Sequence, residues 1–129
     1  METYLQTKRG KVVLVHFWGP NCGPCIREFA KLRALHQKLS GRTDRFAMIS
    51  FTVGMEAPDW RAYLDGHGMD WPQALLVGKT EKLWDDFRVG FIPDYAVIGP
   101  DGTIIADGQS TGLDVDKVEL AIVQALGRP

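Results

Sequence analysis

Two cysteines separated by two residues are the side chains of this sequence with the most reactive chemistry. Cys22 and Cys25 are the two cysteines of the 129-residue chain, and Gly23 and Pro24 stand between them. Such a pair can be a structural disulfide, half of a metal site, or a dithiol that cycles between reduced and oxidised states. The elements that position the pair decide among these three.

The pair falls between a predicted strand and a predicted helix. Residues 11–17, KVVLVHF, are β-branched and almost continuously apolar, which favours a strand buried on both faces. Apolar residues then recur at helical spacing, which predicts a helix from about Cys22 to Leu39, ended by Ser40 and Gly41. Its apolar positions are Ile26, Phe29, Ala30, Leu32, Leu35 and Leu39. Cys22 is therefore expected at a helix N-terminus, where unpaired N–H groups and the helix dipole favour an anion.

That anion is a thiolate, the nucleophile of disulfide exchange. A cysteine with a pKa near 8.5 is only about 3% thiolate at pH 7, whereas a pKa of about 7 makes it roughly half thiolate, a difference of about 2 kcal/mol. Positions i and i+3 share a helix face, so the two sulfurs come within disulfide reach. Cys22 is predicted to attack a target disulfide and Cys25 to resolve the mixed disulfide. Pro24 suits the helix start, and Gly23 allows a tight bend.

The other interpretations of the pair are weaker. A four-residue disulfide loop removes little chain entropy, and a chain of this length buries a core without a cross-link. A zinc site needs four ligands, and the remaining soft partners, His16, His36 and His67, lack a short paired spacing. We therefore expect a redox-active disulfide and neither a metal nor another cofactor. A copper site made of both thiolates and His67 stays open as an alternative.

Composition indicates an ordinary globular protein. The chain has 15 basic and 16 acidic residues, a formal charge of -1, so it shows no electrostatic signature of nucleic-acid or anionic-membrane binding. Residues 8–19 resemble the start of a signal peptide, but His16 interrupts the apolar run and no cleavage site follows. No apolar run approaches the roughly 18 residues of a membrane span. We expect one domain over residues 1–129.

The rest of the chain alternates strand-like and helix-like segments. The helix predicted in the final run 113–127 has a capping box formed by Asp116 and Glu119 and ends at Gly127. Its buried stripe is Val115, Val118, Ile122 and Ala125. Further predicted strands are 45–53, 74–77, 94–98 and 103–107, and further predicted helices are 57–68 and a segment capped by Thr80 whose Leu83, Trp84 and Phe87 face inward.

This order of elements predicts an α/β fold. A strand-helix-strand unit makes its two strands parallel neighbours, here 11–17 and 45–53. The short turn at 99–102 makes the last two strands antiparallel. The expected architecture is a mixed central β-sheet flanked by helices on both faces.

Two stretches carry a resemblance to a known family. KVVLVHFWGPNCGPC (11–25) and VGFIPDYAVIGPDGTII (89–105) resemble the thioredoxin superfamily, in particular the TlpA/ResA-like thiol-disulfide oxidoreductases, from about Lys11 to Leu126. The resemblance implies a thioredoxin fold, a monomer, protein disulfide substrates and an upstream thiol-disulfide reductant. It also implies a cis Ile92-Pro93 bond beside the disulfide, an Ile92 backbone that pairs with substrate, and Trp18 flanking the site, with Pro93 and Asp94 expected among the substrate-binding residues. A strand-start proline at Pro93 and simple core packing of Trp18 stay open as alternatives.

The sequence departs from the family pattern at several positions. His16 stands where thioredoxins carry a buried Asp, so it is either a proton relay for Cys25 or a hydrogen-bonded core histidine. Asn21 replaces the usual tryptophan. Asp94 follows Pro93 where Thr is common, and a carboxylate near Cys22 would raise its pKa. Only ten residues precede the first strand, which fits either a compact variant or a domain of a longer chain.

The glycine and proline between the cysteines resemble the reducing members of the family, so the expected function is reduction of protein disulfides. The alternative is a redox-inert thioredoxin-like binding module, or a copper-handling domain, of a larger protein. The resemblance favours an extracytoplasmic location, and a cytoplasmic one stays open.

Overall fold

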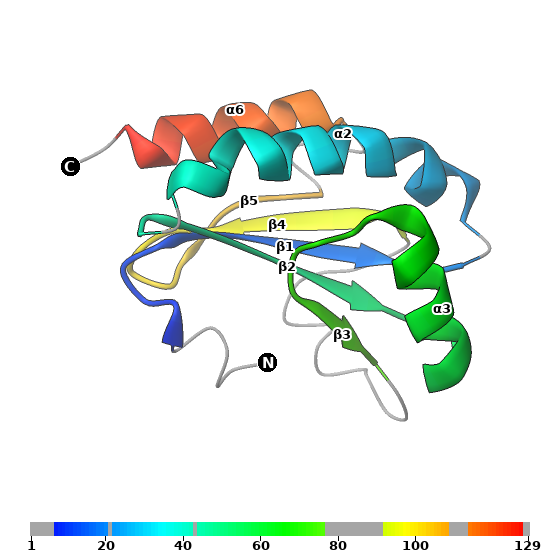
Figure 1. The fold of residues 1–129 in the computed structure, drawn as a ribbon. Helices are drawn as coiled ribbons and strands as arrows, with labels where there is room; N and C mark the ends of the chain where they lie inside the picture. The colour runs from blue at the N-terminus through cyan, green and yellow to red at the C-terminus, as the bar shows by residue number, and fades with distance from the viewer. Residues whose placement is uncertain (1–6, 21, 43, 77–91, 109–113, 128–129) are drawn as a thin grey trace.

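Five strands form one sheet in the computed structural model (Figure 1), which describes residues 7–20, 22–42, 44–76, 92–108 and 114–127. The sheet has the strand order β3-β2-β1-β4-β5. The elements are β1 (Val12–Trp18), α2 (Gly23–Leu39), the 3₁₀ turn η1 (Ser40–Arg42), β2 (Phe46–Thr52), α3 (Ala57–His67), β3 (Gln73–Leu75), β4 (Asp94–Ile98), β5 (Ile104–Asp107) and α6 (Val115–Leu126).

The strand directions confirm the predicted mixed sheet. β1 pairs in parallel with β2, with Val12 opposite Phe46, because α2 carries the chain back between them. β4 pairs antiparallel with β1 and with β5. The turn between β4 and β5 has Gly102 at φ 90°, a conformation that glycine adopts without strain. The α/β prediction therefore holds for the described elements.

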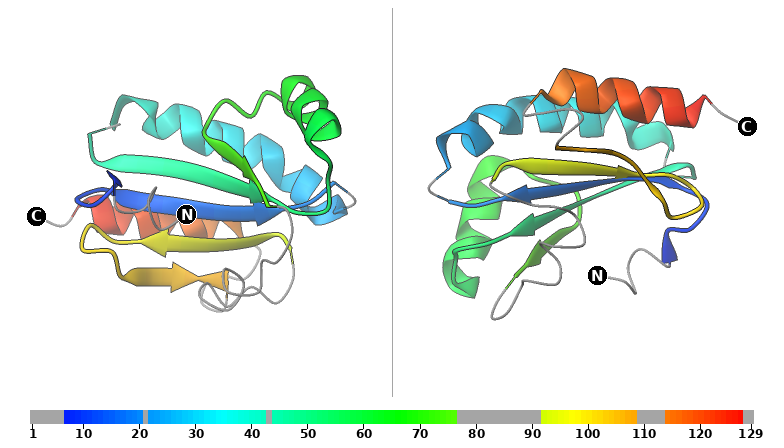
Figure 2. Two further views of the ribbon diagram at one scale, coloured as in Figure 1. Left: turned by 90° about the horizontal axis from the view of Figure 1, so that it is seen from below. Right: turned by 180° about the vertical axis from the view of Figure 1, so that it is seen from behind.

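Helices α2 and α6 pack together against one face of the sheet (Figures 1 and 2). The core beneath them contains alternate residues of β1, namely Val12, Leu14 and Trp18, because side chains of a strand alternate between its two faces. Its helical members include Phe29, Leu32, Leu35, Val118 and Ile122. Helix α3 packs against the same core through Trp60, Tyr63 and Leu64.

A second core lies on the opposite face of the sheet. It is formed by Val13, Val15, Phe17, Ile49, Phe51, Ala96 and Ile98. The helix predicted after Thr80, with Leu83, Trp84 and Phe87, falls outside the described residues. Within the described ranges, no helix is both long and apolar enough to cross a bilayer.

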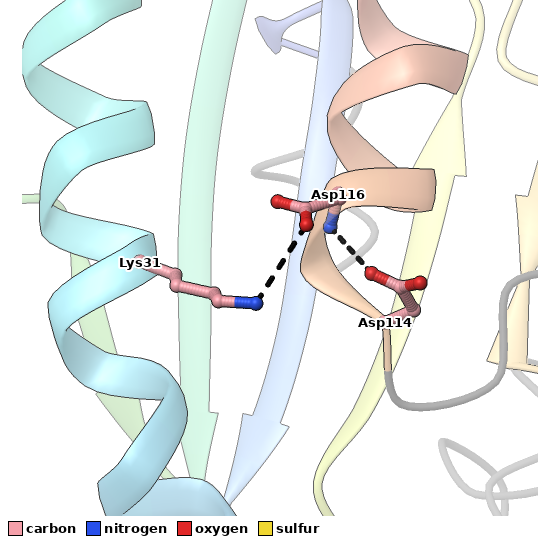
Figure 3. Close-up of polar contacts among 3 residues, drawn as sticks. All are labelled: Lys31, Asp114 and Asp116. Atoms are coloured by element: carbon pink, nitrogen blue, oxygen red, sulfur yellow. Dashed lines mark hydrogen bonds and ion pairs between the residues drawn. The ribbon is translucent and has the colours of Figure 1, made fainter.

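The start of α6 differs from the prediction. Asp114, not Asp116, is the N-cap, and its Oδ1 accepts a hydrogen bond from the Asp116 backbone N at 2.9 Å. The helix starts earlier than predicted because this carboxylate satisfies an otherwise unpaired N–H of the first turn. Glu119 instead accepts a hydrogen bond from Lys38. Asp116 lies 3.7 Å from Lys31 Nζ, which links α6 to α2 (Figure 3).

The remainder of the α6 prediction is confirmed. Its predicted stripe is buried, and Gly127 is the C-cap.

Candidate active site

Cys22 and Cys25 form a disulfide at the start of α2. Their sulfurs are 2.10 Å apart and their Cα atoms 5.2 Å apart. Cys22 is the N-cap, in extended conformation, and Pro24 lies in the first turn, where its missing N–H leaves no bond unmade. The i, i+3 spacing thus brings the sulfurs together as predicted, and Cys22 lies at the helix N-terminus.

The surroundings of Cys22 favour negative charge on its sulfur. Cys22 Sγ accepts a hydrogen bond from the Cys25 backbone N at 3.2 Å. The first turn of α2 contains no acidic residue, so nothing there offsets the positive end of the helix dipole. Cys22 retains 7% of its surface accessible and Cys25 none. An incoming disulfide can therefore reach Cys22 first.

The Ile92-Pro93 peptide bond is cis, as the resemblance implied. Pro93 is buried, and Ile92 packs against the core cluster that contains both cysteines. Gly19 allows this approach, because a Cβ at Gly19 would lie 2.8 Å from Ile92 Cδ1 and 3.1 Å from the Val53 carbonyl oxygen. Sequence reasoning missed Gly19, since no spacing rule links it to Ile92.

Trp18 lies in the core beside the two cysteines and has no exposed surface that could contact a substrate. It is fully buried in the same cluster as both cysteines. Its ring packs edge-on against Phe29 and tilted against Tyr63, each at 5.3 Å. Its Nε1 donates a long, 3.4 Å hydrogen bond to Gln73 Oε1. The core-packing alternative for Trp18 therefore describes its position.

His16 is fully buried on the face of the sheet that α2 covers. Its Nδ1 lies 2.8 Å from Ser50 Oγ, and Ser50 Oγ also accepts from Trp71 Nε1 at 2.7 Å. The Ser50 hydroxyl therefore links the two rings: it accepts from the Trp71 indole and shares with His16 Nδ1 a hydrogen bond whose direction depends on the His16 tautomer. Burial lowers the pKa of His16 to about 3, so the ring is neutral.

Two polar residues near His16 were not singled out from the sequence. Tyr95 lies opposite His16 in the sheet and stacks on it at 5.2 Å. Burial raises the pKa of Tyr95, and the charges of Glu28 and then Asp94 raise it further. Glu28 Oε2, Tyr95 OH and His16 Nε2 are all buried with no hydrogen-bond partner within the described part of the chain. A helix-face argument could have found Glu28, because it lies three residues after Cys25.

Asp94 occupies the other side of the sheet from the cysteines. Its neighbours in alternation along β4, Ala96 and Ile98, belong to the opposite core. Its Oδ1 accepts from the Tyr95 backbone N at 2.8 Å, and its carboxylate packs against Gly108. Burial raises the pKa of Asp94, the hydrogen bond from Tyr95 opposes this, and the charge of Asp107 adds to it. The carboxylate of Asp94 therefore does not share the face on which Cys22 lies.

The other two histidines, His36 and His67, make ring contacts with neighbouring aromatic side chains. His67 stacks on Tyr63 at 3.9 Å and its Nδ1 contacts the Tyr63 carbonyl oxygen, and the His36 ring lies 5.4 Å from Trp71. In the parts of the chain that the structure describes, no three His, Cys, Asp or Glu residues are grouped so as to hold a metal ion. Asn21 lies outside those parts.

Comparison with known proteins identifies the family. The sequence model of the family described as Thioredoxin-like matches residues 10–104, and the chain belongs to this family. "Probable nucleoredoxin 2" of Oryza sativa subsp. japonica is 30% identical over 105 residues, which cover 78% of this chain and 26% of that protein. Thiol-disulfide oxidoreductase ResA of Geobacillus kaustophilus is 24% identical over 118 residues, covering 90% of this chain and 66% of that one. The chain thus spans between a quarter and two thirds of these relatives.

Solved structures show the same fold. A thiol:disulfide interchange protein from Bacteroides sp. superposes with a TM-score of 0.79 at 22% identity, covering 95% of this chain and 78% of that one. The thioredoxin domain of a thiol-disulfide oxidoreductase from Bacteroides vulgatus gives 0.75 at 22% identity, covering 92% and 84%. The thioredoxin fold and the resemblance to ResA-like proteins are therefore confirmed.

Proposed function

We propose that this chain reduces disulfides of protein substrates with the Cys22–Cys25 dithiol and is recharged by an upstream thiol-disulfide reductant. The observation that carries this proposal is the asymmetry of the pair. Cys22 lies at the N-terminus of α2 and keeps a small exposed surface, whereas Cys25 is fully buried. Because of this asymmetry, the sulfur of Cys22 is suited to attack the substrate and the sulfur of Cys25 to resolve the mixed disulfide.

Two exchange steps complete the reaction. The Cys22 thiolate attacks one sulfur of the substrate disulfide, so a Cys22–substrate bond forms, the substrate S–S bond breaks, and the released thiolate takes up a proton. Cys25 then loses its proton and attacks Cys22 Sγ, which releases the second substrate thiol. Two electrons pass to the substrate, and the Cys22–Cys25 disulfide remains.

The residues around the pair take separate roles in this proposal. The backbone of Ile92, before the cis Pro93, pairs with an extended substrate segment. Glu28 takes the proton of Cys25, because its buried Oε2 is an acceptor without a partner in the described residues. His16 is a poor acceptor for this proton, because burial lowers its pKa to about 3. His16 instead positions Tyr95 and the core beneath the motif.

Equilibration with a glutathione buffer tests the direction of electron flow. A reductant is expected to have a potential close to the value of about -270 mV of thioredoxin, whereas a potential near about -120 mV would make the chain an oxidant. The Cys25→Ser variant tests the substrate class. It should retain substrate proteins as mixed disulfides on Cys22, and a variant that captures no protein would favour the redox-inert binding module.

A further inference from the structure

Arg27 places a guanidinium beside the CGPC motif. Its Nη1 lies 3.3 Å from the point that a Cβ on Gly23 would occupy. Gly23 directly follows Cys22, and neighbouring Cα atoms are about 3.8 Å apart. The side chain of Arg27 is exposed and turns back along α2 toward its N-terminus. The guanidinium therefore lies beside Gly23, the residue that follows Cys22.

Arg27 differs from the other cations described on α2. Lys31 pairs with Asp116 at 3.7 Å (Figure 3), Lys38 pairs with Glu119 at 2.9 Å, and Arg33 donates to the His67 carbonyl oxygen at 2.9 Å. Arg27 has no hydrogen bond or ion pair to any residue in the described ranges. No residue in the described part of the chain therefore occupies its five donors.

The glycine of the motif makes this position accessible to the guanidinium. A side chain at residue 23 would crowd Arg27 Nη1, which would have to move away. No acidic residue of the first turn of α2 neutralises the region. The surface next to Cys22 therefore combines the positive end of the helix dipole with a guanidinium that pairs with no residue in the described ranges.

We propose that Arg27 is a specificity-determining residue that selects substrate proteins with a carboxylate within about two residues of the attacked cysteine. This inference rests on the proposed function, because the mixed disulfide is what brings the flanking residues of the substrate to α2. A chain advances at most about 3.6 Å per residue, so only near neighbours of the substrate cysteine reach the guanidinium. Arg binds a carboxylate through two parallel hydrogen bonds. Ile26, which is 45% exposed, adds an apolar contact beside it.

Three disulfide peptides test the inference. They share one sequence and carry Glu, Gln or Lys next to the cysteine that is attacked. The rate of their reduction by the fully reduced protein is measured at about 0.01 M and about 1 M salt, where the screening lengths are about 30 Å and 3 Å. An exposed ion pair corresponds to a difference in rate of roughly 1.4-fold to fivefold. The Glu peptide should react fastest and the Lys peptide slowest at low salt, and the three rates should converge at high salt.

Variants distinguish an effect of the Arg27 side chain at its own position from an effect of the net charge of the protein. Arg27→Gln should abolish the preference, and Arg27→Glu should invert it. Lys31→Gln removes the same charge one turn further along α2, where Lys31 pairs with Asp116, and should leave the preference intact. Equal rates for the three peptides, or a preference that survives Arg27→Gln, would refute the inference while the proposed function stands. Failure of the reduced protein to reduce any of the peptides would contradict the proposed function itself.

Discussion

Burial of His16 should make the folded protein less stable in acid. The pKa of His16 is about 3 in the folded oxidised protein, against an ordinary value of 6.5. Below pH 6.5 the unfolded chain therefore binds a proton at His16 that the folded chain does not. Stability from this residue is fully present above about pH 6.5 and is lost as the pH falls toward 3.

The size of the effect follows from the same two values. At pH 4 the unfolded histidine lies 2.5 pH units below its pKa of 6.5, which corresponds to about 3 kcal/mol at 1.36 kcal/mol per unit, and the folded state gains almost nothing. This is a large part of the roughly 5–15 kcal/mol by which domains are stable. Contributions of the carboxylates cancel when two proteins that differ only at His16 are compared.

Urea unfolding of the oxidised protein at pH 8 and pH 4 measures the effect. His16→Asn keeps a hydrogen-bonding partner for Ser50, as donor or acceptor, and removes the titrating ring. The free energy of unfolding of the unsubstituted protein should fall by about 3 kcal/mol more than that of the variant between these two pH values. The His16 ring should also show no NMR titration above pH 4. Equal pH dependence in the two proteins, or a ring that titrates near pH 6.5, would refute this account of His16.

Three further substitutions test the surroundings of the site. The pKa of Asp94 is raised, so its charged form destabilises the folded protein at pH 7, and Asp94→Asn should therefore raise the melting temperature there. Below about pH 4 the carboxylate is protonated in both states, and the difference in melting temperature should disappear. Gly19→Ala should lower the free energy of unfolding by about 1–3 kcal/mol, since its Cβ would crowd Ile92 and the Val53 carbonyl oxygen; an unchanged urea midpoint would contradict the close approach. Glu28→Gln should slow release of the mixed disulfide in stopped-flow assays without slowing its formation, and unchanged release would exclude Glu28 as the proton acceptor.

The main features of the fold and the reactive pair could be predicted because their signals are local. The apolar run of β1, the helical spacing after Cys25 and the turn before β5 each lie within a few residues. The strand-helix-strand order then fixed the parallel pairing of β1 and β2. The resemblance supplied the cis bond at Pro93.

The polar environment beneath the pair could not be predicted, because it depends on contacts between distant segments. Ser50, which contacts His16, lies 34 residues from it in the sequence, and Trp71, which donates to Ser50, lies 21 residues from Ser50. The register that places Tyr95 beside His16 is set by packing of two strands across the sheet. These contacts make His16 a buried, hydrogen-bonded residue, and its role as a proton relay for Cys25 stays a prediction.

The pH dependence of alkylation of the reduced protein shows whether Cys22 is the activated thiol of the pair. Cys22 should react before Cys25 and titrate well below the ordinary thiol pKa of about 8.5, close to about 7. The Cys25→Ser variant should show the same low pKa, which assigns it to Cys22. A Cys22 thiol that titrates near 8.5, or a Cys25 that reacts first, would contradict the account.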